Sequence, residues 1–117
     1  MNNKPKYHFL KNTRYAIDGF VYALKTESSF KLELLAAFFI ILAIVYIDTS
    51  LTNKLILLVS GILVLIVELV NSAIENVVDL VTKDTQPLAK SAKDIGSAAV
   101  MFSITLHIIC WCVIVLC

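Results

Sequence analysis

The stretch LILLVSGILVLIVELVNSAIENVVD, residues 55–79, joins a long apolar run to a polar helical face. Its first 13 residues carry no charge. Because an α-helix turns by about 100° per residue, five polar side chains fall within about 60° of the first of them: Glu68, Asn71, Ser72, Glu75 and Asp79. A carboxylate at membrane depth is costly and is usually kept for a function. The stretch therefore predicts a membrane-spanning helix with a functional polar face at one end.

Two more apolar runs accompany this stretch, namely residues 34–47 and residues 95–117, the latter interrupted only by His107. Of the 117 residues, 59% are hydrophobic and 16% are charged, whereas soluble domains carry about 25% charged residues. A spanning helix needs about 20 residues. We therefore predict a single all-α integral membrane domain with three transmembrane helices, over residues 30–50, 54–80 and 92–117.

Charge and glycine placement exclude several functions. The chain has ten basic and nine acidic side chains and no basic run interleaved with aromatic residues, so we expect no nucleic-acid partner. Gly19, Gly61 and Gly96 are scattered. Neither a Walker A loop nor a dinucleotide-binding fingerprint can be written on them.

The N-terminal part predicts an amphipathic helix over residues 7–28 that lies on the membrane surface. Two opposite stripes carry this prediction, one apolar and one charged: Leu10, Ile17, Val21 and Leu24 against Lys11, Arg14, Asp18 and Lys25. Glu27 and Glu33 are six positions apart and would not share one face of a straight helix. Either the chain bends near Ser28 and Ser29, or the two acids have different roles.

Basic residues give the orientation. Six precede the first span, one lies in the first loop, three lie in the second loop and none follows the third span: Lys4, Lys6, Lys11, Arg14, Lys25 and Lys31, then Lys54, then Lys83, Lys90 and Lys93. The positive-inside rule places the N-terminus and the second loop in the cytoplasm. We expect a multi-pass protein of a bacterial inner membrane.

Acids and lysines from several segments converge on the cytoplasmic side: Glu27, Glu33, Glu75, Lys93 and Asp94. Paired carboxylates suit Mg²⁺, which completes its shell with substrate phosphates, and a neighbouring lysine suits a phosphate. Glu68 lies about 10 Å deeper along the helix than Glu75. A metal-nucleotide near Glu75 and a lipid alcohol near Glu68 would meet for phosphoryl transfer. The structural alternative is that the stripe only joins helices, for which Asn71 and Ser72 would suffice.

Three stretches resemble the small prokaryotic diacylglycerol kinase family: residues 27–33 (ESSFKLE), 68–79 (ELVNSAIENVVD) and 92–100 (AKDIGSAAV). The resemblance runs from about Tyr15 to Trp111. It implies a homotrimeric helical bundle in which each protomer has a surface helix and three spans. It also implies Mg²⁺ as cofactor, ATP as phosphoryl donor and diacylglycerol, among the membrane lipids, as acceptor.

The resemblance also implies roles for individual residues. Glu68 would be the catalytic base, and Glu27 and Glu75 would hold the metal-nucleotide. Further contacts to ATP would come from Tyr15, Asp84, Thr85, Gln86, Lys93 and Asp94. The lipid would contact Phe30, Lys31, Glu33, Glu68, Ser97 and Trp111. Asn71, Ser72 and Asp79 would support the site, and His8 departs from the family pattern, which has an arginine there.

Two alternatives stay open. A sibling branch of the family phosphorylates undecaprenol, and residues 87–90 (PLAK) resemble its loop, while Glu33 and residues 95–100 resemble the diacylglycerol branch. A small transporter of protons or cations would explain a buried Glu68, but it leaves the cytoplasmic acids and lysines without a role. We expect His107 to face the bundle as a buried histidine.

Overall fold

The computed structural model describes residues 8–117, which fold into four helices joined by short connections. These are α1 (Phe9–Thr26), α2 (Ser28–Tyr46), α3 (Leu51–Val81) and α4 (Pro87–Leu116). Helices α2, α3 and α4 are long and apolar enough to cross a membrane. The prediction of an all-α membrane protein is confirmed. Residue 7, the predicted start of the surface helix, and Lys4 and Lys6 lie outside the described residues.

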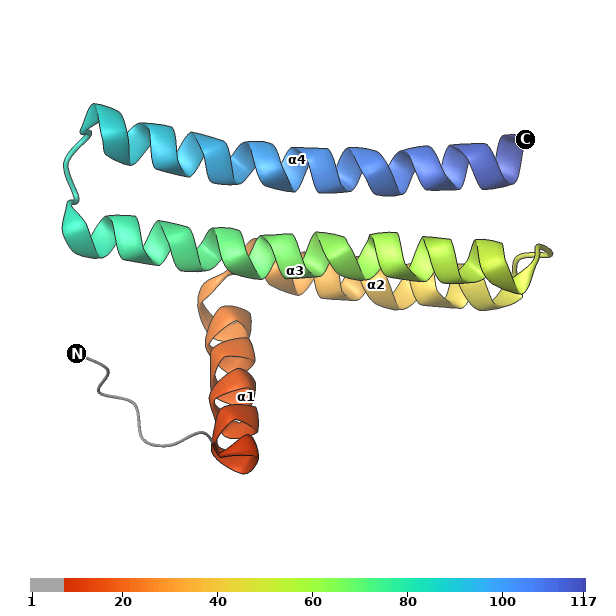
Figure 1. Cartoon of the computed structure of the whole chain (residues 1–117), viewed down its shortest axis with the longest axis horizontal. Coiled ribbons are helices and arrows are strands. Elements are labelled where there is room, and N and C mark those ends of the chain that lie inside the picture. Colours follow the sequence, from red (N-terminus) through yellow and green to blue (C-terminus); the bar gives the residue numbers. More distant parts are fainter. Residues whose placement is uncertain (1–7) are drawn as a thin grey trace.

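Helices α3 and α4 form an antiparallel hairpin, and α2 packs against α3, lying behind it in the view of Figure 1. Helix α1 runs crosswise to these three. With 31 and 30 residues, α3 and α4 are each about 45 Å long at 1.5 Å per residue, which exceeds the ~30 Å hydrocarbon core. At the α3–α4 connection both helices extend beyond the start of α2 (Figure 1). We call this the projecting end.

The corner between α1 and α2 lies at Glu27, whose extended backbone (φ −112°, ψ 100°) interrupts the helix. The chain thus bends at the residue before Ser28, next to the Ser28–Ser29 pair at which the sequence allows a bend. Phe20 and Phe30 close the corner with an edge-to-face contact, their ring centroids 5.7 Å apart. Such a contact favours one arrangement of the two helices.

Pro87 is the first residue of α4. The helix thus begins before the predicted third span at residue 92. Proline suits this place, because its fixed φ fits the first turn and its missing N–H is not needed there. At the start of α3, the Ser50 hydroxyl caps the helix by accepting a hydrogen bond from the backbone N–H of Asn53 at 3.1 Å. Lys54 Nζ donates to the Val45 carbonyl at 2.8 Å, which satisfies an acceptor at the end of α2.

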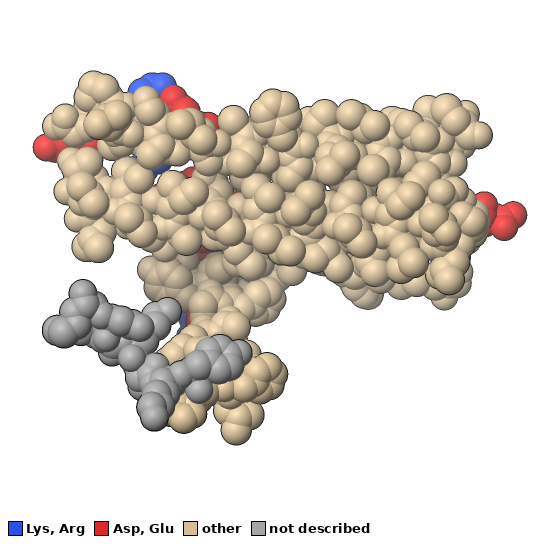
Figure 2. All heavy atoms as spheres, in the orientation of Figure 1, with Lys and Arg blue, Asp and Glu red and all other residues tan. Residues whose placement is uncertain are grey.

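Very little apolar surface is buried inside one chain. The described residues bury four hydrophobic side chains: Ala23, Phe30, Ile44 and Leu57. Large apolar side chains are exposed along α2, α3 and α4, and the visible charges gather at the ends, mainly the projecting end (Figure 2). This surface matches a chain surrounded by lipid or by other protein chains.

Candidate active site

The two most deeply placed acids of the predicted site face each other. Glu33 on α2 and Glu68 on α3 lie within hydrogen-bonding reach through their carboxyl groups. A hydrogen bond between two carboxyl groups requires a proton on one of them, since carboxylate oxygens only accept. Oε2 of Glu33 is buried, and no donor among residues 8–117 bonds to it. The structure thus brings together two predicted lipid-site residues.

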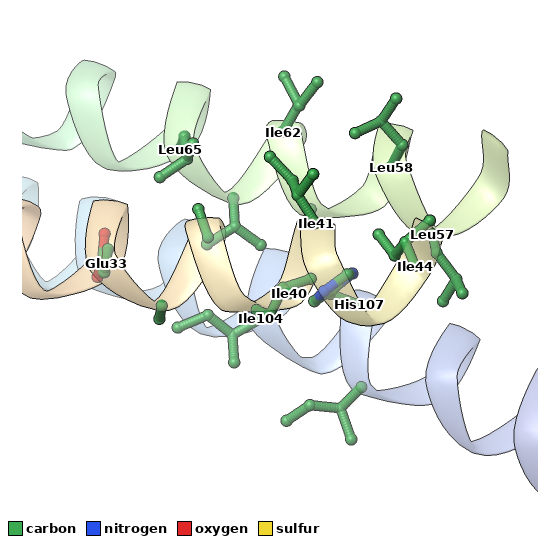
Figure 3. A pocket seen from close by; sticks show the side chains of 15 residues that line it. Glu33, Ile40, Ile41, Ile44, Leu57, Leu58, Ile62, Leu65, Ile104 and His107 are labelled. Atoms are coloured by element: carbon green, nitrogen blue, oxygen red, sulfur yellow. The ribbon is translucent and has the colours of Figure 1, made fainter. Parts of the chain in front are cut away.

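An apolar cavity of about 320 Å³ begins at Glu33 and runs between α2, α3 and α4 (Figure 3). Its walls are almost entirely aliphatic, with Ile40 and Ile44 on one side and Leu57 and Ile104 on others. The Glu33 carboxyl lies at one end, away from the crowded aliphatic part in the close-up. A cavity of this kind accommodates a hydrocarbon chain with a polar group at its end.

Asn71 connects the polar stripe of α3. Its Nδ2 donates to Oε1 of Glu75 at 3.1 Å, and the spacing of four residues puts both side chains on one face. Asn71 is buried, and its Oδ1 has no hydrogen-bond partner among the described residues. An unpaired buried carbonyl costs about 1–3 kcal/mol. Burial of the Asn71 amide therefore costs stability, but it places Nδ2 where it can hold the Glu75 carboxylate.

Lysines of α4 meet acids at the projecting end. Lys93 Nζ lies 2.7 Å from Oδ1 of Asp79 across the α3–α4 hairpin, and it is also close enough to Glu75 to attract that carboxylate. Lys90 Nζ lies 2.6 Å from Oδ2 of Asp94, one helical turn away. The structure thus brings Lys93 to the polar face of α3, while Asp94 pairs on the surface of α4.

Glu27 and Glu75 do not line the same hollow. It is half-buried at the α1–α2 corner and borders a hollow of about 510 Å³ between α1 and α3, together with Ser72 and Asn76 but not Glu75. Within residues 8–117, no three His, Cys, Asp or Glu side chains gather closely enough to hold a metal ion. Glu75 with its amide partner offers the hard oxygen donors that Mg²⁺ uses, and Mg²⁺ commonly binds only one or two carboxylates. The donor chemistry at Glu75 fits magnesium, while Glu27, the other predicted ligand, borders a hollow that Glu75 does not line.

The remaining predicted lipid residues are spread out. Phe30 is buried against Phe20 at the helix corner, whereas Lys31 and Ser97 are exposed. Trp111 is half-buried, and its indole Nε1 donates to Nε2 of His107 at 3.0 Å.

The predicted nucleotide residues outside α3 and α4 are all solvent-accessible. Tyr15 is exposed on α1, and Asp84, Thr85 and Gln86 are exposed in the short α3–α4 connection. The backbone N–H of Gln86 donates to the backbone carbonyl of Asp84 at 2.9 Å, which tightens this connection. His8, the position that departs from the family pattern, precedes α1 and is exposed.

Two contacts between α3 and α4 are not predicted from the sequence. Ser60 Oγ and His107 Nδ1 form a buried 2.8 Å hydrogen bond between α3 and α4, so His107 faces the bundle as expected but with a partner that was not foreseen. Gly96 lies buried against Asn71. Both contacts depend on the antiparallel register of α3 and α4. The spacing of residues within one helix does not reveal this register.

Comparison with known proteins agrees with this arrangement. The family model "Prokaryotic diacylglycerol kinase" matches residues 14–115. The chain is 37% identical to the diacylglycerol kinase of Pseudomonas aeruginosa over 92% of this chain and 87% of that protein. It is 35% identical to the diacylglycerol kinase of Escherichia coli K12 over 90% of this chain and 86% of that protein. A Helicobacter pylori relative of the same name is 34% identical over 83% of this chain and 76% of that protein.

The match covers nearly all of the described helices, including both members of the Glu33–Glu68 and Asn71–Glu75 pairs. The resemblance drawn from three short stretches is therefore confirmed over most of the chain. The chain belongs to the prokaryotic diacylglycerol kinase family, a family of lipid kinases.

Proposed function

We propose that this protein transfers the γ-phosphoryl group of ATP to the free hydroxyl of diacylglycerol, forming phosphatidic acid and ADP. The observation that carries the proposal is the position of Glu68. This acid faces Glu33 at the end of an apolar cavity, and Glu75 follows seven residues later on the same helix, about 10 Å away. A lipid hydroxyl and a nucleotide phosphate can approach each other between these two levels.

In this mechanism Glu68 is the general base. With the shared proton on Glu33, Glu68 keeps its negative charge and can take the proton of the lipid hydroxyl. The freed oxygen attacks the γ-phosphorus, and the bond from the γ-phosphorus to the β–γ bridging oxygen breaks. ADP leaves with that bridging oxygen. Phosphoryl transfer depends mainly on such positioning and on charge neutralisation.

The charge neutralisation would come from the projecting end. Lys93 lies near Glu75 and would pair with a phosphate, while Asp94 and the exposed Tyr15 and residues 84–86 would complete the nucleotide contacts. Glu75 and Glu27 would hold Mg²⁺, which supplies positive charge next to the phosphates when bound. In this proposal Asn71 keeps Glu75 directed toward the nucleotide, and Ser72 and Asp79 support the same face.

We also propose that the active unit is a homotrimer in the inner membrane, with the N-terminus in the cytoplasm. Two observations support an assembly. Apolar side chains are exposed along all three spans, and Glu27 lies in a hollow that Glu75 does not border. A neighbouring protomer could supply the second carboxylate to each metal site.

One assay tests the proposed reaction. Purified protein in mixed micelles is incubated with Mg²⁺ and with ATP labelled at the γ-phosphate. The acceptor is either diacylglycerol or undecaprenol, and a control contains no added lipid. Label in phosphatidic acid supports the proposal. Label only in undecaprenyl phosphate assigns the chain to the sibling activity that residues 87–90 resemble, and label in neither lipid rejects both kinase proposals and leaves transport to be tested.

A further inference from the structure

We infer that Gly96 is a positioning residue of the active site: by lacking a side chain it lets α4 lie against the Asn71 amide and so fixes the direction of the Glu75 carboxylate. The inference rests on the proposed role of Glu75 in holding the metal-nucleotide. It adds a residue of α4 to which the proposed function assigns no contact with nucleotide or lipid.

The argument begins with the two ends of the Asn71 amide. Its Nδ2 donates to Glu75 at 3.1 Å, and a carboxylate cannot donate in return. Turning the amide over would therefore bring two acceptors together. With the amino group committed to Glu75, Oδ1 must point the other way, and it lies directly against Gly96 of α4.

The Asn71 side chain leaves no room for a side chain at position 96. A Cβ added there would collide with Oδ1 of Asn71 and lie 3.2 Å from its Cγ. The backbone does not require glycine, because no described glycine has a positive φ. Glycine also weakens a helix relative to alanine. The close approach to Asn71 is thus the physical reason for a glycine at this place.

The other glycines show that this contact is particular. A Cβ added to Gly19 would meet nothing within 4 Å, and one added to Gly61 would have the His107 ring as its nearest neighbour, at 3.2 Å. Gly61 lies in the same α3–α4 interface but seven residues before Glu68, about 10 Å from it. It therefore provides a matched control for a methyl group added between the two helices.

A methyl group at position 96 must displace the Asn71 amide or move α4 away from it. Either change disturbs the hydrogen bond that holds Glu75. Loss of a partner that orients a metal-binding side chain typically lowers metal affinity or activity by ~10–100-fold. We expect Gly96→Ala to raise the KM for Mg-ATP within this range while changing the KM for diacylglycerol much less.

A double-mutant cycle separates positioning from packing. The Cβ of a residue 96 side chain would lie 4.0 Å from the Asn71 Cβ, an ordinary contact. Asn71→Ala therefore makes room for Gly96→Ala. If Gly96 acts through Asn71, adding Gly96→Ala to Asn71→Ala changes the KM for Mg-ATP by less than twofold. Independent effects that multiply in the double variant would overturn the inference.

A binding measurement accompanies the kinetics. Mn²⁺ bound to each variant with a non-hydrolysable ATP analogue is titrated by electron paramagnetic resonance, and oligomer size is checked by chromatography. We expect weaker Mn²⁺ binding in Gly96→Ala and wild-type binding in Gly61→Ala. Equal weakening in both variants would overturn the inference, because it would indicate a general effect of helix packing.

Three further outcomes can be told apart. If Gly96→Ala does not assemble, the inference requires Asn71→Ala to restore assembly, and failure to restore it overturns the inference. If the wild-type protein phosphorylates no lipid alcohol, the proposed function fails. If the wild-type protein is active but the cycle is additive, only the role of Gly96 is rejected.

Discussion

Ser60 and His107 join α3 to α4 by a buried hydrogen bond of 2.8 Å in the apolar part of the hairpin. The direction of each bond follows from Trp111, since an indole N–H can only donate. His107 Nε2 therefore accepts from Trp111, Nδ1 carries the ring proton and donates to Ser60, and the Ser60 hydroxyl donates to the Leu57 carbonyl at 3.1 Å. Every polar hydrogen in this chain of bonds has an acceptor.

This network predicts a measurable loss in His107→Phe. The ring volume is nearly kept, but the Trp111 N–H and the Ser60 oxygen each lose a partner. Hydrogen bonds between membrane helices contribute about 0.6–2 kcal/mol, so we expect the free energy of unfolding in mixed micelles to fall by that amount. Trp111 is the only tryptophan, so its single indole N–H resonance should also move upfield. An unmoved resonance would contradict the network.

The second prediction concerns topology. The α2–α3 and α3–α4 connections lie at opposite ends of α3 (Figure 1), and Thr52 and Thr85 are exposed near them. After replacement of Cys110, Cys112 and Cys117 by serine, a cysteine at Thr52 should react with an impermeant reagent in intact spheroplasts. A cysteine at Thr85 should react only after lysis. The reverse pattern would reject a cytoplasmic N-terminus.

The third prediction concerns the proposed metal ligand. Glu75→Gln keeps an oxygen that can accept from Asn71 Nδ2, the bond seen at 3.1 Å, but it removes the negative charge that a hard cation needs. We expect no measurable turnover at any Mg²⁺ concentration and an unchanged oligomer. Removing the metal from wild-type protein with a chelator should give the same loss. Turnover close to that of the wild type in the variant would remove Glu75 from the metal site.

Much of the fold follows from composition and spacing. Three apolar runs predict the spans, and the six-residue separation of Glu27 and Glu33 offers a bend near Ser28 and Ser29 as one of two interpretations. The structure has the bend, at Glu27. Asn71 and Glu75 are four residues apart in one helix, so a helical projection of the sequence already places them on the same face. Local periodicity is sufficient for these features.

Contacts between helices are different. The Lys93–Asp79 pair and the Ser60–His107 bond depend on the register of the α3–α4 hairpin, which the five-residue connection and the packing of whole helices determine. The contact of Gly96 with Asn71 depends on the same register. The meeting of Glu33 with Glu68 depends in turn on how α2 packs along α3. None of these distances is encoded within a single helix.

The fourth prediction uses the Lys93–Asp79 pair. Both side chains are 42% exposed, and exposed ion pairs contribute about 0–1 kcal/mol. Lys93→Met should therefore change the free energy of unfolding very little. If Lys93 instead serves a phosphate, the KM for Mg-ATP should rise by ~10-fold or more, since charge-assisted hydrogen bonds contribute about 1.5–3 kcal/mol. A stability loss without any change in KM would assign the lysine to structure alone.

The last prediction concerns Glu68, for which the catalytic and structural interpretations differ most. If it is the general base, Glu68→Gln should lower kcat by ~10²–10⁴-fold. Its partner supplies the control, because the amide of Glu33→Gln can still donate to Glu68 and leaves the base charged. We expect Glu33→Gln to lower kcat less than Glu68→Gln, although both variants remove one carboxyl group from the same buried pair. If Glu68 only joins α2 to α3, glutamine at either position preserves a hydrogen bond, and both variants should keep their kcat and show a lowered unfolding midpoint. That result would return Glu68 to a structural role.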